Sequence, residues 1–239
     1  MLLLALGLCG PLHAQSRIGG ELALASRLVD RGLPVSAATP VLQGSLSWMP
    51  GQSWSFGLAG AVELRSPGRP VLVLGRATRS WSLSGDWLAQ ASLLHYDHRA
   101  TQGVAVPDRT DATLYFTYRD LLSVGVSAMH PHEGDGRRVL GAADAELSVP
   151  LSRALSLSAG AGIAEAMLSR YPAGRYAANG DYYAGATRLR RYGFGNLGLG
   201  WHQGPWRLRV DRHFNSLGDR RVYGGEAPPQ WVVTASWAF

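Results

Sequence analysis

The last ten residues, Gln230 to Phe239, read QWVVTASWAF and have the period of a β-strand. Side chains alternate between the two faces of a strand, so every second residue lies on the same face. One face of this segment is apolar and carries aromatic rings at its ends: Trp231, Val233, Ala235, Trp237 and Phe239. The opposite face is small and mostly polar, with Gln230, Thr234 and Ser236. The pattern predicts a strand that has one face in an apolar environment.

The composition of the chain leaves its class open. The chain has 239 residues, 46% of them apolar, and a mean hydropathy of -0.04. It has no apolar run long enough to cross a bilayer as a helix. A membrane barrel exposes only every second strand residue to lipid, so its mean hydropathy is as low as that of a soluble domain. The arrangement of the residues has to decide between the two.

The positive charge of the chain does not point to nucleic acid. The formal net charge is +6 and the pI is about 9.9. All basic residues are arginine, none is lysine, and they are scattered along the chain. A surface that binds nucleic acid needs clustered basic residues, so we expect no nucleic-acid partner.

The start of the chain, MLLLALGLCGPLHAQ, has the apolar core and the small-residue end of a secretory signal peptide. We therefore expect a signal peptide over residues 1–14 and the folded domain over residues 15–239. The usual positively charged segment before the apolar core is absent, which leaves open a start upstream of Met1. A buried N-terminal strand and a lipid-modified Cys9 are alternatives. Because Cys9 is the only cysteine, we expect no intrachain disulfide and no cysteine metal cluster.

About twelve segments from Ile18 onward alternate as strands, each close to the ~10 residues that a tilted strand needs to cross a bilayer. The clearest runs from Ser53 to Leu64, with Trp54, Phe56, Leu58, Val62 and Leu64 on one face. Further segments repeat the pattern at residues 111–119, 122–127, 138–149, 155–163 and 206–214. The sequence therefore predicts an all-β fold, a transmembrane antiparallel β-barrel of about 12 strands.

The links between these segments alternate in length. Links 50–52, 119–120, 150–152 and 204–205 are tight, whereas links 99–110, 131–136, 167–190 and 215–229 are long. Outer-membrane barrels have short periplasmic turns and long outer loops, so this order places both termini in the periplasm and the long loops outside. Three features leave the strand count open: the short link 65–69, the poorly alternating segment 71–81 and a further strand at 182–187.

A soluble β-sandwich also has alternating strands and is the alternative fold. The apolar faces, however, end in tryptophans, as do the aromatic girdles of membrane barrels: Trp48, Trp54, Trp87, Trp201, Trp206, Trp231 and Trp237. The opposite faces are rich in serine, glycine and charged residues, where the core of a sandwich would need bulky side chains. The pattern favours the membrane barrel.

The end of the chain resembles the closing strand of bacterial outer-membrane barrels, which also stops on an aromatic residue. This resemblance implies that Trp237 and Phe239 belong to the signal that the barrel assembly machinery reads.

The stretch from Ser26 to Gly44 resembles the opening of the TorF family of porins. The residues at the family's motif positions are Ser26, the pair Arg31-Gly32 and the stretch Pro40-Val41-Leu42-Gln43. The segment LLHYDH, from Leu93 to His98, is similar to the strand end that follows in that family. Leu28 and Asp30 stand where the family usually carries aromatic residues. The resemblance implies a porin fold, while a fold alone does not establish a function.

The strand faces opposite the lipid would line the interior of the barrel. We predict the following lining residues: Glu63, Arg138, Asp144, Glu146, Arg207, Arg209, Asp211 and His213. Charges there must pair or meet water, because an isolated charge in a dry interior is costly. Twelve strands lie between filled barrels of ~8 strands and open barrels of ~16, so a salt-bridged plug and an open channel are both possible. For an open channel, the excess of arginine predicts a preference for anions.

A catalytic alternative rests on Arg212-His213-Phe214-Asn215-Ser216, at an outer strand end where barrel lipid A deacylases hold a His and a Ser. Those enzymes have one residue between the two, whereas two residues here place His213 and Ser216 on opposite strand faces unless a bulge intervenes. Glu226 would orient the histidine of such a hydrolase. Because the spacing is unfavourable, we do not expect an enzyme.

Two other sets of residues have weaker functional interpretations. His95, Asp97 and His98 have the chemistry of metal ligands, but at a strand end they are more typical of a solvated rim, and we expect no metal and no cofactor. Tyrosines and arginines in the long loop 169–190 suit sugars or the phosphates of lipopolysaccharide.

The sequence as a whole predicts an exported, monomeric outer-membrane channel, porin-like, for the passive passage of small solutes. Its surroundings would be outer-membrane lipid and lipopolysaccharide. The alternatives are a lipid-modifying barrel enzyme and a closed barrel that acts through its outer loops as a structural or binding protein.

Overall fold

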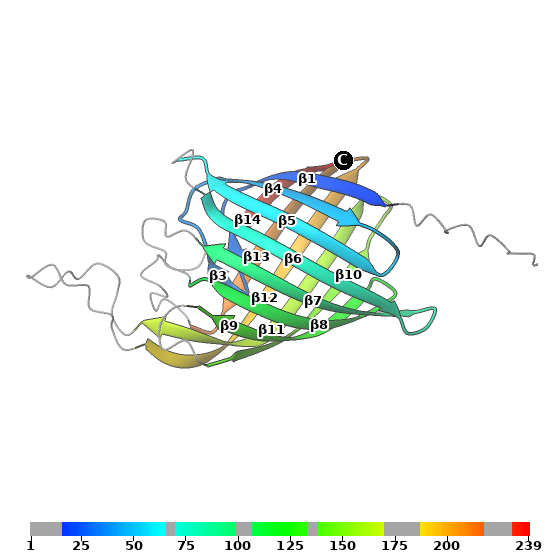
Figure 1. The fold of residues 1–239 in the computed structure, drawn as a ribbon. Helices are drawn as coiled ribbons and strands as arrows, with labels where there is room; N and C mark the ends of the chain where they lie inside the picture. Colours follow the sequence, from blue (N-terminus) through cyan, green and yellow to red (C-terminus); the bar gives the residue numbers. More distant parts are fainter. Residues whose placement is uncertain (1–15, 66–69, 99–106, 133–137, 170–186, 218–230) are drawn as a thin grey trace, which may run out of the picture.

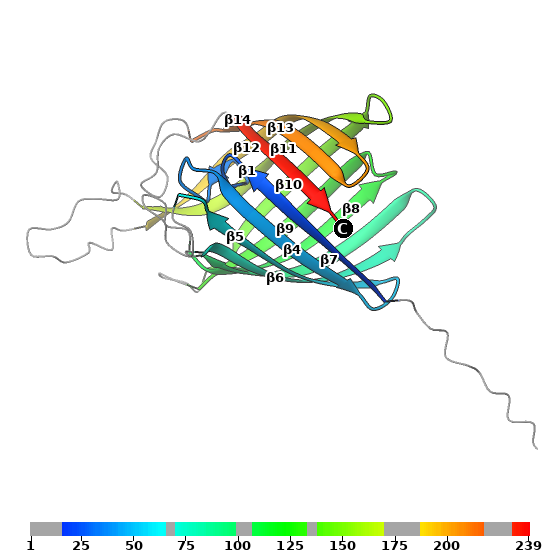
Figure 2. The same ribbon diagram turned by 90° about the horizontal axis from the view of Figure 1, so that it is seen from above.

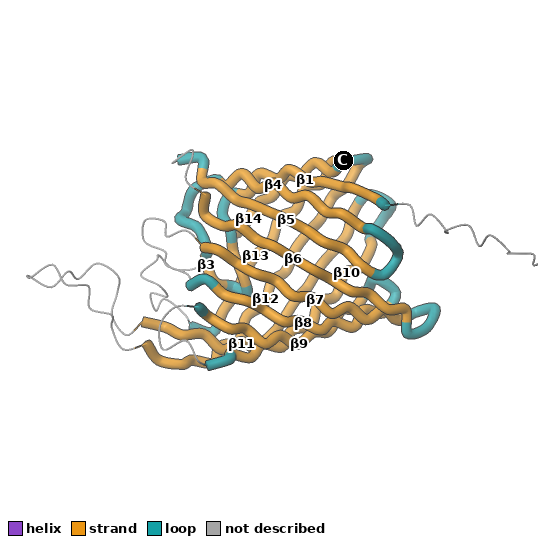
Figure 3. Tube along the Cα trace, in the orientation of Figure 1, coloured by secondary structure: helices purple, strands orange, loops and turns teal. Residues whose placement is uncertain are grey.

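The structure is a computed structural model that describes residues 16–65, 70–98, 107–132, 138–169, 187–217 and 231–239. Regular structure in these ranges consists of strands, drawn in orange in Figure 3. No helix in these ranges is long and apolar enough to cross a membrane. The signal peptide expected over residues 1–14 lies outside the described residues.

Twelve antiparallel strands form one closed barrel (Figure 1). The strands are β1 (Arg17–Ala25), β4 (Val41–Met49), β5 (Trp54–Glu63), β6 (Pro70–Ser82), β7 (Trp87–His98), β8 (Arg109–Tyr118), β9 (Leu122–Pro131), β10 (Leu140–Pro150), β11 (Leu155–Ser169), β12 (Thr187–Gln203), β13 (Trp206–Asn215) and β14 (Trp231–Ala238). From β4 to β14 each strand pairs with the next along the chain, and β1 pairs with both β4 and β14. The predicted fold class and strand number are confirmed, and the doubtful segment 71–81 is strand β6.

The first and last strands close the barrel, and Figure 2 shows them side by side. Leu22 of β1 is the register partner of Trp237 of β14. Beyond the strand end, the Gly20 amide donates to the Phe239 carbonyl at 2.8 Å, and the Phe239 amide donates to the Gly20 carbonyl at 2.9 Å. Backbone pairing therefore continues to the last residue, and no strand edge is left open at this seam.

The outer surface of the barrel is apolar and the inner surface is not. On β5, Phe56 and Leu58 are 39% and 60% exposed, whereas Ala61 and Glu63 on the opposite face are 3% and 7% exposed. Large exposed apolar side chains recur on all twelve strands, and a soluble surface does not carry so continuous a band. The band matches the lipid-facing surface of a membrane barrel and argues against the β-sandwich.

Six of the seven tryptophans that the sequence singled out gather at the end of the barrel where the tight links lie. Trp48, Trp54, Trp87, Trp201, Trp206 and Trp237 flank these links or the C-terminus, and Trp231 lies at the other end. The rings of Trp48, Trp54, Trp87 and Trp237 pack against neighbouring aromatic rings, as for Trp87 and Tyr118, whose centroids are 5.1 Å apart. The arrangement is that of an aromatic girdle at one membrane interface.

The alternation of link lengths is confirmed, with tight links at 50–53, 83–86, 119–121, 151–154 and 204–205. The predicted link 167–190 is too long, because β11 and β12 continue to Ser169 and from Thr187. Directly before this extension, Glu165 of β11 and Arg191 of β12 are register partners and form an ion pair at 2.9 Å. The adjacent charges Arg190 and Arg191 break the apolar alternation at this point, so the sequence pattern did not predict the extension. Most of the further strand considered at 182–187 lies outside the described residues.

The link between β1 and β4 turns into the barrel and forms a second, two-stranded sheet. It consists of β2 (Val29–Asp30) and β3 (Leu33–Pro34), joined by Arg31 and Gly32. Both turn residues have positive φ, 46° and 74°, as a two-residue hairpin turn of type I′ requires. We call residues 29–34 the inner hairpin. No pattern in the sequence predicted that this stretch enters the lumen.

Candidate functional site

An ion-pair cluster fixes the tip of the inner hairpin to β8. The Arg109 guanidinium donates to Asp30 of the hairpin and, at 3.1 Å, to Asp111 on its own strand. Arg31 of the hairpin lies 3.4 Å from Asp111, which is fully buried. Two arginines and two aspartates thus alternate around the contact. This alternation of opposite charges offsets the cost of taking each charge out of water.

The charges of the hairpin stabilise one another. Burial alone raises the pKa of Asp30, but the charges of Arg109 and Arg31 outweigh it, so the pKa lies below its ordinary value. Burial alone lowers the pKa of Arg31, but the Asp30 carboxylate outweighs it, so the pKa lies above its ordinary value. Both side chains are therefore charged at neutral pH.

One flank of the inner hairpin packs against the wall formed by β9, β10, β11 and β12. Leu33 is 8% exposed and belongs to an apolar cluster with Met129, Leu140, Ala142, Ala164, Ala166 and Tyr192. The space left on this flank is about 50 Å³. The apolar contact and the ion pairs together hold the hairpin to one side of the lumen.

The turn of the hairpin reaches the wall formed by β12 and β13. The Asn215 side-chain amide donates to the Gly32 carbonyl at 2.8 Å. A Cβ atom at Gly32 would lie 2.8 Å from the Phe214 carbonyl and 3.1 Å from Cβ of Phe194. Only glycine fits both this close approach and the positive φ, so the Arg31-Gly32 pair is required by the docked geometry.

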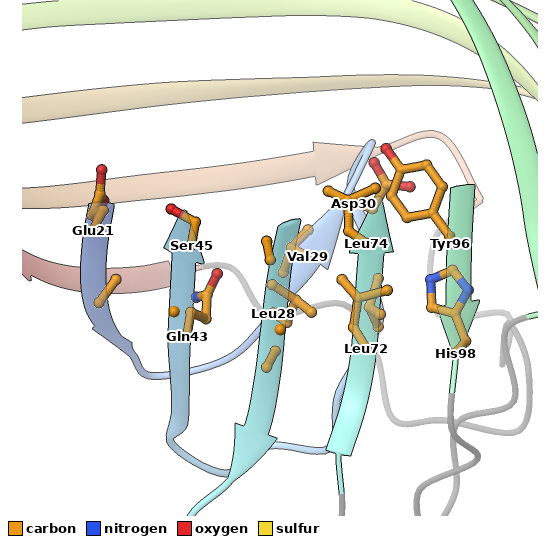
Figure 4. Close-up of a pocket in the computed structure, with 16 residues that line it drawn as sticks. Glu21, Leu28, Val29, Asp30, Gln43, Ser45, Leu72, Leu74, Tyr96 and His98 are labelled. Carbon is orange, nitrogen blue, oxygen red and sulfur yellow. The ribbon is translucent and has the colours of Figure 1, made fainter. Parts of the chain in front are cut away.

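The other flank of the hairpin faces an open cavity of about 280 Å³ against β1 and β4 to β7 (Figure 4). Leu72 and Leu74 of β6 and Tyr96 and His98 of β7 line it beside the hairpin. Glu21 and Gln43 line its far side. This passage is largely apolar, with acidic groups at Glu21 and Asp30.

Two larger cavities continue the interior of the barrel. One, of about 490 Å³, lies against the tip of the hairpin, β6 to β8, β10, β12 and β13. The other, of about 400 Å³, lies toward the end of the barrel where Phe239 is located. Asp30 and Tyr96 line both the 280 Å³ and the 490 Å³ cavity, and Arg76 lines both the 490 Å³ and the 400 Å³ cavity.

Four of the residues that the sequence placed in the lumen line the 490 Å³ cavity: Asp144, Glu146, Arg209 and His213. Arg209 lies 3.5 Å from Glu146 and 2.8 Å from Asp211, which is 6% exposed. The contact between Arg209 and Glu146 joins β13 to β10 across the two strands between them, while Asp211 lies on the same strand as Arg209. The paired charges therefore narrow the lumen without filling it.

The remaining predicted lining residues lie near the two ends of the barrel. Arg207 is 4.0 Å from Glu21. Glu63 accepts a hydrogen bond from the Ala37 amide at 3.0 Å and so holds the link that returns from the inner hairpin. Arg138 is exposed and precedes β10, which begins at Leu140, so placing it on that strand was wrong.

The structure does not bring the catalytic candidates together. His213 lines the 490 Å³ cavity, while the Ser216 hydroxyl accepts a hydrogen bond from the Gly193 amide at 2.8 Å. β13 ends at Asn215 and has no register shift against β12, so no bulge turns the two side chains to one face. Glu226 lies outside the described residues.

The histidines near the long-link end form a small cluster. His95 and His132 both contact the Thr110 hydroxyl, at 3.1 Å and 2.9 Å, and His98 instead lines the 280 Å³ cavity. Within the described ranges, no three histidine, cysteine or acidic side chains are placed to hold a metal ion. Residues 170–186, most of the loop considered for sugar or phosphate binding, lie outside those ranges.

The sequence reasoning missed the four residues that dock the hairpin: Asp30, Arg31, Arg109 and Asp111. A signal was present, because Arg109 and Asp111 are two apart and share one strand face. Asp30-Arg31-Gly32 has the composition of a turn. Neither signal tells which residues meet across the barrel.

Among solved structures, the NanC porin is similar to this chain, with a TM-score of 0.52 and 10% identity over 92% of this chain and 98% of that one. The chain has the fold of that porin. Two larger structures also align with this chain. The alignment with OccAB3 of Acinetobacter baumannii has a TM-score of 0.40 and 8% identity and covers 55% of that chain. The alignment with OccD3 (OpdP) of Pseudomonas aeruginosa has a TM-score of 0.40 and 11% identity and covers 65% of that chain. These two alignments cover 84% and 94% of this chain. No protein-family model and no curated protein matches the sequence.

Proposed function

We propose that this protein is a porin-like channel of the bacterial outer membrane, through which small solutes pass passively. The observation that carries the proposal is the sharing of lining residues by three adjoining cavities, the first and third of which also share Glu21 and Leu74. Asp30 and Tyr96 connect the first cavity to the second, and Arg76 connects the second to the third. An interior filled by side chains would not leave such a series of spaces.

The inner hairpin sets the course of the proposed path. Its β9–β12 flank is closed by the apolar cluster, and its other flank borders the 280 Å³ cavity. Solutes would therefore pass off the barrel axis, between the hairpin and the wall of β4 to β7. Leu28, Val29, Leu72 and Leu74 make this part of the path apolar.

The proposal includes an orientation and a setting. The long-link end with the inner hairpin faces outside, toward lipopolysaccharide, and both termini lie in the periplasm. Outer-membrane lipid covers the apolar band, and the assembly machinery reads Trp237 and Phe239. The seam of β1 and β14 supports a monomer, because it leaves no strand edge for a partner. Membership of the TorF family also belongs to the proposal and is supported by the Arg31-Gly32 turn.

The preference for anions stays a prediction. The 490 Å³ cavity is lined by Arg31, Arg76 and Arg209 and by Asp30, Asp144 and Glu146. Its charges are balanced, so a preference would have to arise from residues elsewhere along the path.

Single-channel conductance of the refolded mature protein in a planar bilayer tests the function. We expect stepwise conductance. The conductance should be larger when residues 29–34 are replaced by a short glycine linker. The reversal potential in a salt gradient reports the ion preference. A shift in gel mobility on heating shows that the barrel is folded. Folded protein that gives no conductance, with or without the hairpin, would contradict the proposal.

A further inference from the structure

Two charged side chains that line the 490 Å³ cavity have no ion-pair partner among the described residues. Arg76 of β6 is exposed and forms no ion pair with any residue in the described ranges. Its guanidinium lies over Gly57 of β5, where a Cβ atom would be 3.4 Å from Nε. Asp144 of β10 is half-buried and accepts hydrogen bonds from the Tyr115 hydroxyl at 3.1 Å and 3.2 Å, without an arginine partner among the described residues.

The other charges that line this cavity are paired. Arg209 is paired with Glu146 and Asp211. Arg31 is paired with Asp111, and Asp30 with Arg109. One cation and one anion are thus left to face the water of the cavity.

The barrel keeps these two charges apart and holds one of them in place. β7, β8 and β9 lie between β6 and β10, so Arg76 and Asp144 stand on separate walls of the same cavity. Tyr115 reaches from β8 across β9 to Asp144. Gly125 on β9 makes room for it, because a Cβ atom there would clash with the tyrosine ring. The Tyr115 hydroxyl therefore positions the carboxylate without supplying a countercharge.

The geometry points to a binding subsite for a small zwitterion, whose anionic group faces Arg76 and whose ammonium group faces Asp144. A zwitterion satisfies both charges with charge-assisted hydrogen bonds, whereas an ion with one charge leaves the other wall charge without a partner. Opposite wall charges in a confined channel also raise the local concentration of a matching solute. This inference rests on the proposed channel function and assigns it a solute class.

Swelling of liposomes that contain the full barrel tests the inference. The zwitterion 4-aminobutyrate is compared with erythritol, a neutral polyol of similar size, and the ratio of their entry rates is the readout. We expect a ratio above one for the wild type. Arg76→Gln and Asp144→Asn should each lower the ratio about two- to fivefold, the range that one exposed ion pair supplies, and leave entry of erythritol unchanged.

Arg79→Gln is the matched control, because Arg79 is on the same strand but lies 5.6 Å from the Trp54 ring and 5.2 Å from the Trp81 ring. It should keep the wild-type ratio. Equal entry of both solutes into wild-type liposomes would overturn the zwitterion subsite and leave the channel standing. A raised ratio that neither variant lowers would overturn it as well. Folded protein that admits neither solute would instead contradict the channel itself.

Discussion

The guanidinium of Arg31 lies 3.4 Å from the carboxylate of Asp111, although eighty residues separate the two along the chain. Asp111 is fully buried and also binds Arg109, 3.1 Å away. One carboxylate therefore ties the tip of the inner hairpin to the barrel wall. The position of the hairpin, and with it the width of the lumen, depends on this contact.

Replacing Asp111 with Asn should release the inner hairpin. The change leaves Arg31 without its carboxylate and Arg109 with Asp30 alone, and removal of one partner of a buried pair costs about 3–5 kcal/mol. We expect a larger and noisier single-channel conductance while the barrel stays folded.

Asp86→Asn is the control for this variant. Asp86 is paired with Arg119 at 2.8 Å, but the two side chains are 46% and 57% exposed, and exposed pairs contribute little. Its conductance should equal that of the wild type. An Asp111→Asn channel with wild-type conductance would show that the ion pairs do not position the hairpin.

Docking of the hairpin should weaken only in acid. The pKa of Asp30 is lower in the docked hairpin than its ordinary value of ~3.9, because Arg109, Arg31 and His98 favour its charged form. A carboxyl whose pKa is lowered by docking stabilises the docked state above its ordinary pKa. This contribution disappears as the pH falls through the lowered value.

We therefore expect constant conductance between about pH 8 and pH 5 and a rise below about pH 4. Tyr96 and the buried Asp111 are further titratable groups close to Asp30. Comparison of the wild type with Asp30→Asn isolates the contribution of Asp30 to the pH dependence of the conductance. The variant should conduct more at neutral pH and show a smaller acid step. Identical pH profiles for the two proteins would exclude Asp30 as the group responsible.

Shortening Leu33 to Ala should loosen the hairpin from the β9–β12 wall. A buried leucine contributes about 2–5 kcal/mol relative to alanine, and Leu33 is 8% exposed in the apolar cluster. Val35, 6% exposed, is close to the hairpin, and a cysteine placed there in the mature chain reports its release. We expect faster maleimide labelling of that cysteine in the Leu33→Ala background. Leu83→Ala, at a residue 59% exposed in a tight link, should leave the labelling rate unchanged.

Gly20→Ala should weaken the closing seam. A Cβ atom at Gly20 would lie 2.5 Å from Cζ and 2.7 Å from Cε2 of Phe239, so the terminal ring has to move. Overpacking of this kind costs about 1–3 kcal/mol, which urea unfolding in detergent would show as a lower midpoint. Gly19→Ala is the control, since its Cβ atom would meet Phe239 and Ser47 at ordinary distances of 3.7 Å and 3.6 Å. Equal midpoints for the two variants would mean that the ring is not part of the seam.

The barrel could be predicted from the sequence because its signal is local. The alternation of Trp54, Phe56 and Leu58 with small residues depends only on the two-residue repeat of a strand facing lipid. The same rule did not predict the end of β11, which continues to Ser169, or the start of β12, which begins at Thr187. It failed again at Arg138, which continues the alternation of β10 but precedes the strand.

The candidate site was predicted in part. Asp144, Glu146 and Arg209 could be assigned to the inner face because successive residues of a strand alternate between its two faces. This alternation gives the face on which a charged residue lies but not the residue with which it pairs. Arg209 is paired, whereas Arg76 has no ion-pair partner in the part of the chain that the structure describes, and this difference depends on strands brought together by the closure of the barrel.

By itself the sequence determined the class of fold, the face that each strand turns to lipid and the end at which the tight turns lie, because neighbouring residues encode all three. Only the tertiary structure decided that residues 29–34 fold into the lumen. That docking relies on Asp30 and Arg109, 79 residues apart, and on Asn215 and Gly32, 183 residues apart. Contacts of such range exist only once the barrel has closed around them.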